Sequence, residues 1–130
     1  MILLDTNVVI QYMKGLEPVV KRLEAASPRE VAIPSVVVYE LEYGTLKTGS
    51  ARRRELASGL LAIFTQVPFD HDAAKEAAGI RVELEGQGIV IGPVDLLIAG
   101  TAVSRGALLV TANTKEFSRV KGLRIEDWSR

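Results

Sequence analysis

Short runs of apolar residues alternate along the chain with longer segments in which apolar residues recur every three or four positions. The runs Ile2–Leu4, Val31–Ile33 and Ala107–Val110 are apolar throughout. Uninterrupted apolar runs of this length are typical of strands that are buried on both faces, as in parallel sheets. The alternation of such strands with helical segments predicts an α/β fold with a central, mostly parallel sheet.

Helical periodicity fills most of the sequence between these runs. Helices are predicted after Asn7, before Ser27, over 36–47, 51–65 and 72–86, and from Pro93 onward. Two shorter segments, 67–69 and 89–91, are expected to be extended, the first of them as an edge strand because edges tolerate proline. The core stripe expected for the helix over 51–65 consists of Leu56, Leu60, Ile63 and Phe64.

Composition narrows the class of protein. The 130 residues, 48% of them apolar, predict one globular domain over 1–130. The absence of cysteine excludes disulfides and thiolate sites and fits a reducing cytoplasm. No signal-peptide pattern or membrane-spanning apolar run is present, so no membrane partner is expected. Equal numbers of acidic and basic residues, 16 each, argue against bulk electrostatic binding of nucleic acid but permit a local basic patch.

Acidic and polar residues follow two of the predicted strands directly. Asp5 comes after the first strand, and Asn113 and Glu116 come after the last buried one. The carboxyl ends of strands form the edge at which open α/β sheets bind ligands. Asp5 is also a favoured N-cap residue, so a purely structural role at the start of a helix is the alternative.

One glutamate lies on the apolar side of a predicted helix. Glu40 shares its stripe with Val36 and Gly44, and a carboxylate facing the packed side is costly without a partner or a metal ion. Gly44 is therefore expected to leave space beside this carboxylate. The alternative is that Glu40 is a surface acid like Glu42.

A further acid lies in the first turn of the helix that begins at Pro93. Asp95 shares a stripe with Ile98 and Ala102 and is expected to face packing, although an acid at this position can simply complement the helix dipole. If these carboxylates gather, their mutual repulsion raises their pKa values unless cations are bound. Oxygen ligands without histidine or cysteine suit Mg²⁺ or Mn²⁺, and such a site points to phosphoryl chemistry.

Four segments together resemble the signature blocks of PIN-domain ribonucleases, in order and in spacing. They resemble in particular the VapC toxins of bacterial type II toxin–antitoxin systems. The tail over 119–128 is similar to that of one VapC subgroup. The four segments are Leu3–Asn7, Tyr39–Gly44, Gly92–Ala99 and Thr111–Phe117.

The resemblance implies a PIN-domain-like α/β/α sandwich with an acidic pocket at the strand ends. It also implies an endoribonuclease that depends on Mg²⁺ or Mn²⁺, with Asp5, Glu40 and Asp95 as the metal-binding acids. A fourth acid is common in the family, and either Asn113 or Glu116 stands at that position here.

Other properties of the family concern supporting residues, partners and substrates. Thr6 and Thr111 match positions that support the acidic pocket. Members are typically homodimers that a cognate VapB-type antitoxin inhibits, and the subgroup with this tail suggests cleavage of tRNA in the anticodon loop.

Four basic residues are candidates for RNA binding, and two other functions remain as alternatives to a ribonuclease. Arg52, Arg53, Arg54 and Lys115 are candidates for contacts to RNA phosphates, with a solvated surface as the alternative. A non-catalytic interaction module is one rival reading. An aspartate-nucleophile phosphohydrolase of the haloacid-dehalogenase type is another, but it usually needs a second Asp where this chain has Asn7.

Overall fold

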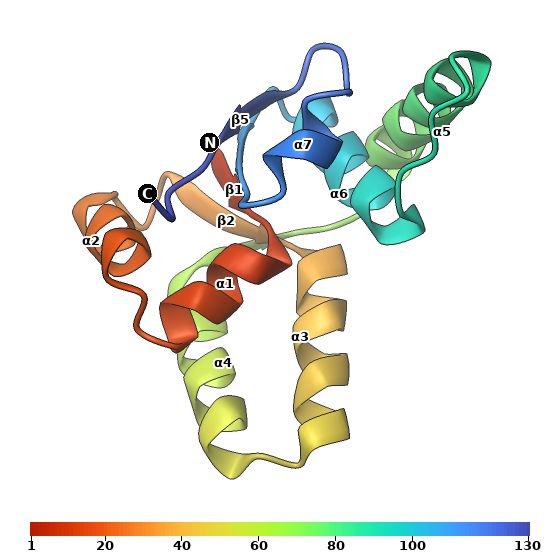
Figure 1. Ribbon diagram of the computed structural model, residues 1–130. Helices are drawn as coiled ribbons and strands as arrows, with labels where there is room; N and C mark the ends of the chain where they lie inside the picture. Colours follow the sequence, from red (N-terminus) through yellow and green to blue (C-terminus); the bar gives the residue numbers. More distant parts are fainter.

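The computed structural model describes residues 1–130 and is organised around one five-stranded sheet (Figure 1). The strands lie in the order β3-β2-β1-β4-β5, and every neighbouring pair is parallel. The expected α/β fold is confirmed, and the sheet is entirely rather than mostly parallel. The strands are β1 (Ile2–Leu4), β2 (Val31–Pro34), β3 (Thr65–Val67), β4 (Leu108–Val110) and β5 (Arg124–Glu126).

Seven helices connect and cover these strands. Figure 1 shows α3 and α4 as a hairpin that extends away from the sheet, whereas α5 and α6 lie against each other on another side. None of the helices is both long and apolar enough to cross a membrane. The helices are α1 (Thr6–Met13), α2 (Glu17–Ala25), α3 (Ser35–Thr48), α4 (Ala51–Ile63), α5 (His71–Gly86), α6 (Pro93–Ser104) and α7 (Thr114–Phe117).

The pairing of the two central strands sets the edge at which polar residues meet. Leu4 of β1 lies opposite Val110 of β4, and both side chains are fully buried. The next residues in the chain, Asp5 and Thr111, therefore leave the sheet side by side. The backbone N–H of Asp5 still donates to the Val110 carbonyl, at 2.9 Å, which continues the sheet ladder to this edge.

Two strands at the edges of the sheet differ from the expectation. The tail adds β5 beside β4, an edge strand that its mixed composition did not indicate, and Trp128 packs back on the body with 4% of its surface exposed. The expected edge strand at 67–69 lies two residues earlier, as β3.

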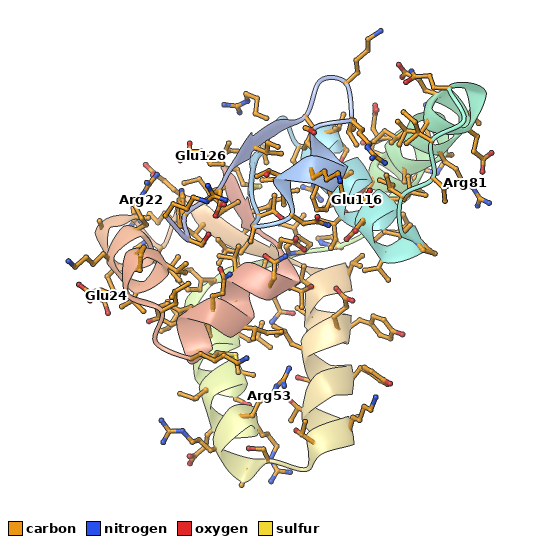
Figure 2. The ribbon with its side chains drawn as sticks, in the orientation of Figure 1. Arg22, Glu24, Arg53, Arg81, Glu116 and Glu126 are labelled. Carbon is orange, nitrogen blue, oxygen red and sulfur yellow. The ribbon has the colours of Figure 1, made fainter.

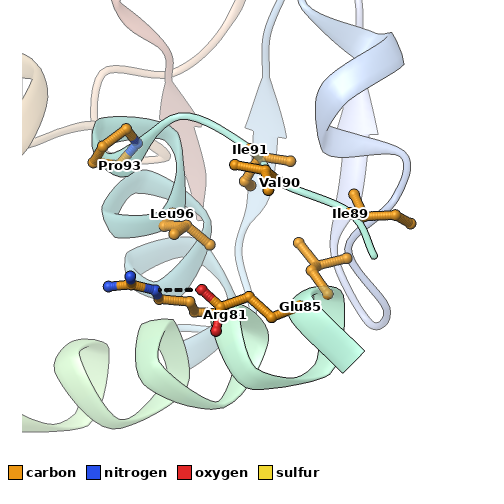
Figure 3. A pocket seen from close by; sticks show the side chains of 8 residues that line it. Arg81, Glu85, Ile89, Val90, Ile91, Pro93 and Leu96 are labelled. Atoms are coloured by element: carbon orange, nitrogen blue, oxygen red, sulfur yellow. Dashed lines mark hydrogen bonds and ion pairs between the residues drawn. The ribbon is translucent and has the colours of Figure 1, made fainter. Parts of the chain in front are cut away.

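Residues 89–91 form no strand, contrary to the expectation. Ile91 is buried, and the segment runs back along α5, where it lines a cavity of about 130 Å³ (Figure 3). An ion pair between Arg81 and Glu85, 3.0 Å long and one helical turn apart, lies at this cavity. The lining is otherwise mostly apolar, so the segment contributes packing rather than chemistry.

The inward face of α4 was only partly predicted. Ala57 and Leu60 are buried, whereas Leu56 and Ile63 are 39% and 64% exposed. Helix α4 packs mainly against α1, α3 and β3, and this narrow contact covers a smaller stripe than its apolar pattern suggests.

The closest helix packing lies between α5 and α6 and depends on Gly100. A Cβ atom at this position would lie 2.6 Å from the Cβ of Ala77 and 2.7 Å from the carbonyl oxygen of Ala73. Contacts this short with backbone cannot be relieved by a rotamer change, so the helices would have to separate.

We expect Gly100→Ala to lower the free energy of unfolding by about 1–3 kcal/mol, the usual cost of overpacking a core. Gly79→Ala in α5 is the matched control, since a Cβ there meets nothing within 4 Å. That substitution should stabilise the protein by about 0.5–1 kcal/mol through helix propensity. Urea denaturation measures both changes, and equal effects would contradict the packing argument.

Candidate active site

Asp5 is the most buried carboxylate of the molecule, with 4% of its surface exposed. Its side chain accepts hydrogen bonds from the hydroxyl of Thr111 at 2.7 Å, the backbone N–H of Thr6 at 2.8 Å and the amide of Asn7 at 3.3 Å. Burial raises the pKa of Asp5, and these hydrogen bonds oppose the rise. Asp5 thus caps α1, as the structural alternative proposed, while it also faces the other acids described below.

Glu40 projects from the second turn of α3 toward the start of α1. The hydroxyl of Thr6 donates to its Oε1 atom at 2.5 Å, so one threonine joins the two elements that carry Asp5 and Glu40. The charge of Glu40 contributes to the raised pKa of Asp5. The reading of Glu40 as a plain surface acid is therefore wrong.

Asp95 lies in the first turn of α6 and joins the same group. The pKa of its carboxyl is raised to about 6, first by burial and then by the negative charges of Asp5, Glu40 and Glu116. No lysine or arginine forms an ion pair with Asp5, Glu40 or Asp95.

The fourth acid comes from α7, a helix of one turn that the sequence reading did not include. Glu116 projects from α7 (Figure 2). Its Oε2 atom is buried without a hydrogen-bond partner and forms a long ion pair, 3.9 Å, with the Arg119 guanidinium. Asn113 contributes its backbone, whose N–H donates to the Thr111 hydroxyl at 2.9 Å, but its side chain makes no hydrogen bond. Glu116 thus adds negative charge beside Asp95, whereas Asn113 contributes only its backbone to these contacts.

Thr111 and Asn7 connect the elements at the acidic edge, the edge of the sheet at which Asp5, Glu40, Asp95 and Glu116 lie. The Thr111 hydroxyl donates to Asp5 and accepts from Asn113, and it is fully buried. Asn7 donates to Asp5 and accepts from the backbone N–H of Ala112 at 3.2 Å, so it joins α1 to the loop after β4. The sequence reading gave Asn7 no role in the site, although its place three residues after β1 was a usable signal.

The basic residues of α4 do not form one uniform face. Arg52 and Arg54 are exposed, whereas Arg53 turns inward between α4 and α3 (Figure 2). A Cβ on Gly44 would lie 2.6 Å from the Arg53 guanidinium, so Gly44 leaves space for this arginine and not for the Glu40 carboxylate. Lys115 is exposed on α7 and forms no ion pair. The single histidine, His71, is exposed at the start of α5.

Comparison with known proteins agrees with this fold. The family model described as PIN domain matches residues 2–123. A tRNA(fMet)-specific endonuclease VapC from Shigella flexneri is 40% identical over 128 residues, which cover 98% of this chain and 97% of that protein. The protein of the same name from Salmonella typhimurium is 35% identical over 97% of this chain and 96% of its own length.

A solved structure extends the agreement to three dimensions. The crystal structure of DNA-bound VapBC from Salmonella typhimurium contains a chain that superposes on this one with a TM-score of 0.90. The two are 37% identical, and the match covers 98% of this chain and 97% of the other. The chain belongs to the PIN-domain family, and within it to the VapC ribonucleases.

The charge of Asp95 is expected to lower the stability of the folded protein at neutral pH. Since the folded-state pKa of about 6 lies above the ordinary value of 3.8, folding favours the protonated form, and stability rises as pH falls from 6 toward 4. We expect Asp95→Asn to stabilise the metal-free protein at pH 7 by about 1–2 kcal/mol, a value reduced for solvent screening of a partly exposed group.

The matched control is Asp72→Asn, which also removes an acid from the first turn of a helix. Asp72 is exposed, and its loss should cost at most about 0.5 kcal/mol of favourable dipole interaction. Urea denaturation in EDTA at pH 7 and near pH 4 measures both variants. If Asp95→Asn stabilises equally at the two pH values, the raised pKa is not the cause.

Proposed function

We propose that this chain is an endoribonuclease that hydrolyses phosphodiester bonds in RNA with the help of Mg²⁺ or Mn²⁺. The observation that carries the proposal is the gathering of four carboxylates from different elements, of which three have no ion pair and Glu116 has only a long one, 3.9 Å, to Arg119. Such an arrangement destabilises the protein by itself, and a divalent cation would relieve the repulsion.

The donor set fits a hard divalent cation. All four acids offer oxygen atoms, and one of these, Oε2 of Glu116, is buried without a hydrogen-bond partner, 3.9 Å from the Arg119 guanidinium. Mg²⁺ and Mn²⁺ prefer such oxygen ligands and retain several waters, so few protein ligands are required. No three acids are already placed at the spacing of a complete metal site. Binding would therefore draw the side chains inward, with Asp5 and Asp95 as the main ligands and Glu40 and Glu116 beside them.

The protein residues supply position and charge. Thr111 and Thr6 orient the carboxylates of Asp5 and Glu40 through short hydrogen bonds. Asp95 is ionised above its pKa of about 6 and so can act as a ligand at neutral pH. Glu40 would help to hold the ion or orient the attacking water. A bound divalent ion supplies Lewis-acid activation of water and stabilises charge on the phosphoryl oxygens.

The relatives support a more specific substrate and partner. Two of them bear the name tRNA(fMet)-specific endonuclease, which supports tRNA as the substrate class here. The solved VapBC structure supports a VapB-type antitoxin as partner, and a homodimer acting in the cytoplasm is the assembly that we propose. Arg52, Arg54 and Lys115 are exposed and free of ion pairs, as contacts to RNA phosphates require.

The cleavage assay compares two glutamates of α3 that lie two positions apart. Glu40→Gln should reduce the rate of RNA cleavage at least about 100-fold, because the carboxylate at the site is lost. Glu42→Gln removes an exposed acid of the same helix and should cleave at the wild-type rate. Sequencing of new RNA ends, with Mg²⁺, with Mn²⁺ and with EDTA, reads the result.

Full activity of Glu40→Gln, or cleavage that persists in EDTA, would refute the proposed site. Asp5→Asn provides the complete loss against which both variants are compared. A folded wild-type protein that produces no cuts in total RNA would instead favour the non-catalytic interaction module.

Binding of the cation is measurable without RNA. An ion that binds only the folded state stabilises it by RT ln(1 + [L]/Kd), about 2.7 kcal/mol at a hundredfold excess over Kd. Mn²⁺ should therefore raise the unfolding temperature of the wild-type protein and of Asp72→Asn. It should have little effect on Asp95→Asn, and an equal rise in all three proteins would place the ion elsewhere.

A further inference from the structure

A cleft between α1 and α4 is lined by three basic side chains and by no acidic one. It has a volume of about 340 Å³, and its cations are Lys14 at the end of α1 and Arg52 and Arg53 in the first turn of α4. The rest of the lining is one serine and three apolar side chains. None of the three cations forms an ion pair. The cleft therefore holds positive charge that no acid of this chain neutralises.

Arg53 is the cation whose position the fold alone does not explain. Its side chain lies between α3 and α4 (Figure 2), is partly buried, and has its Nε atom buried without a hydrogen-bond acceptor. Removing an unpaired charge and its donors from water is costly. A cation in the first turn also opposes the dipole of α4, so helix stability gains nothing from it. An unpaired guanidinium at this place indicates a site for an anion.

The Arg53 guanidinium lies along the face of α3 that carries Glu40. Its Nη2 atom would lie 2.6 Å from a Cβ on Gly44, and Gly44 follows Glu40 by one turn, about 6 Å along the same face. Glu40 is held by Thr6 at the start of α1, whereas Lys14 lies at the other end of α1, about 12 Å away. The cleft therefore continues from the acids along α1 and α3.

We propose that this cleft binds a backbone phosphate of the RNA strand near the scissile one, with Arg53 as the main contact and Lys14 and Arg52 at the rim. The inference rests on the proposed RNA cleavage at the acids. Every nucleotide carries a phosphate, so a strand whose scissile phosphate lies at the acids brings a further phosphate to the cleft. A guanidinium donates paired, charge-assisted hydrogen bonds to phosphate oxygens. Such contacts position the strand for cleavage without selecting its bases.

The salt dependence of RNA binding tests this contact without cleavage. A short, fluorescently labelled single-stranded RNA is titrated with the Asp5→Asn protein, and its anisotropy is measured at several salt concentrations. The logarithm of the binding constant falls with the logarithm of salt concentration by about 0.7 for each phosphate neutralised on a single strand. Arg53→Gln should weaken binding about 10- to 100-fold and reduce this slope by about 0.7. Lys14→Gln should act in the same direction with a smaller loss, since Lys14 is exposed.

The matched control is Arg29→Gln. Arg29 is an exposed arginine without an ion pair, and it precedes β2 and so lies at the end of the sheet opposite the acids. Its loss should leave the affinity and the slope unchanged. The unfolding temperature of Arg53→Gln should equal or exceed that of the wild-type protein, because an unpaired, partly buried charge is removed. A clearly lower unfolding temperature would show that Arg53 supports the helices, and would overturn the site.

A modified RNA identifies the phosphate that the cleft binds. One phosphate at a time is replaced by an uncharged methylphosphonate. At one position near the cut, this replacement should weaken binding to the Asp5→Asn protein at least about tenfold, but less than about twofold when Arg53 is also replaced by glutamine, because the contact is already lost. Equal losses in both proteins at every position would mean that Arg53 contacts no phosphate.

The other outcomes separate this site from the nuclease itself. An unchanged salt slope in Arg53→Gln and Lys14→Gln would overturn the cleft and leave cleavage at the acids intact. A wild-type protein that binds RNA with an Arg53-dependent slope but does not cut it would refute the proposed function and retain the cleft as an RNA site. If Arg53→Gln weakens binding of a VapB-type antitoxin and leaves RNA binding unchanged, the cleft belongs to that protein interface and the inference is wrong.

Discussion

The hydrogen bond from Thr111 to Asp5 is the interaction on which the acidic edge depends. It joins the residue that follows β4 to the residue that follows β1, and it exists because Leu4 and Val110 are paired in the parallel sheet. A hydroxyl that donates to a buried carboxylate favours its charged form and fixes its orientation. The second hydrogen bond, from Thr6 to Glu40, connects the start of α1 to α3 and orients the Glu40 carboxylate in the same way.

The acids give the molecule a local conflict between stability and function. Burial and like charges raise the pKa of Asp95 to about 6, so at neutral pH the folded protein holds negative charges that oppose one another. The fully buried apolar residues of β1 and β4, directly behind this edge, offset the cost. Functional sites commonly retain such unfavourable interactions, because ligand binding depends on them. A divalent cation would relieve the repulsion between the carboxylates, and this relief would add to its binding free energy.

The hairpin of α3 and α4 connects this edge to the rest of the surface. Its inner side holds Glu40 by Thr6 and accommodates the Arg53 guanidinium over Gly44. Its outer side leaves two tyrosines and a lysine exposed beside the acids. One helix therefore carries both a carboxylate of the acidic edge and the exposed aromatic side chains of the molecule.

The sequence by itself determined the α/β class and singled out Asp5, Glu40 and Asp95, whose charges the structure brings together. These follow from local patterns: an acid directly after a buried strand, and acids on the apolar stripes of helices. Only the tertiary structure decided which polar groups hold these acids, because Thr6, Asn7 and Thr111 meet them through contacts across different elements. The place of Glu116 beside Asp95 depended on α7, and the partner of Gly44 depended on how α3 and α4 pack. Strand β5 was likewise decided by tertiary structure, since an edge strand derives its conformation from pairing with β4 rather than from its own apolar pattern.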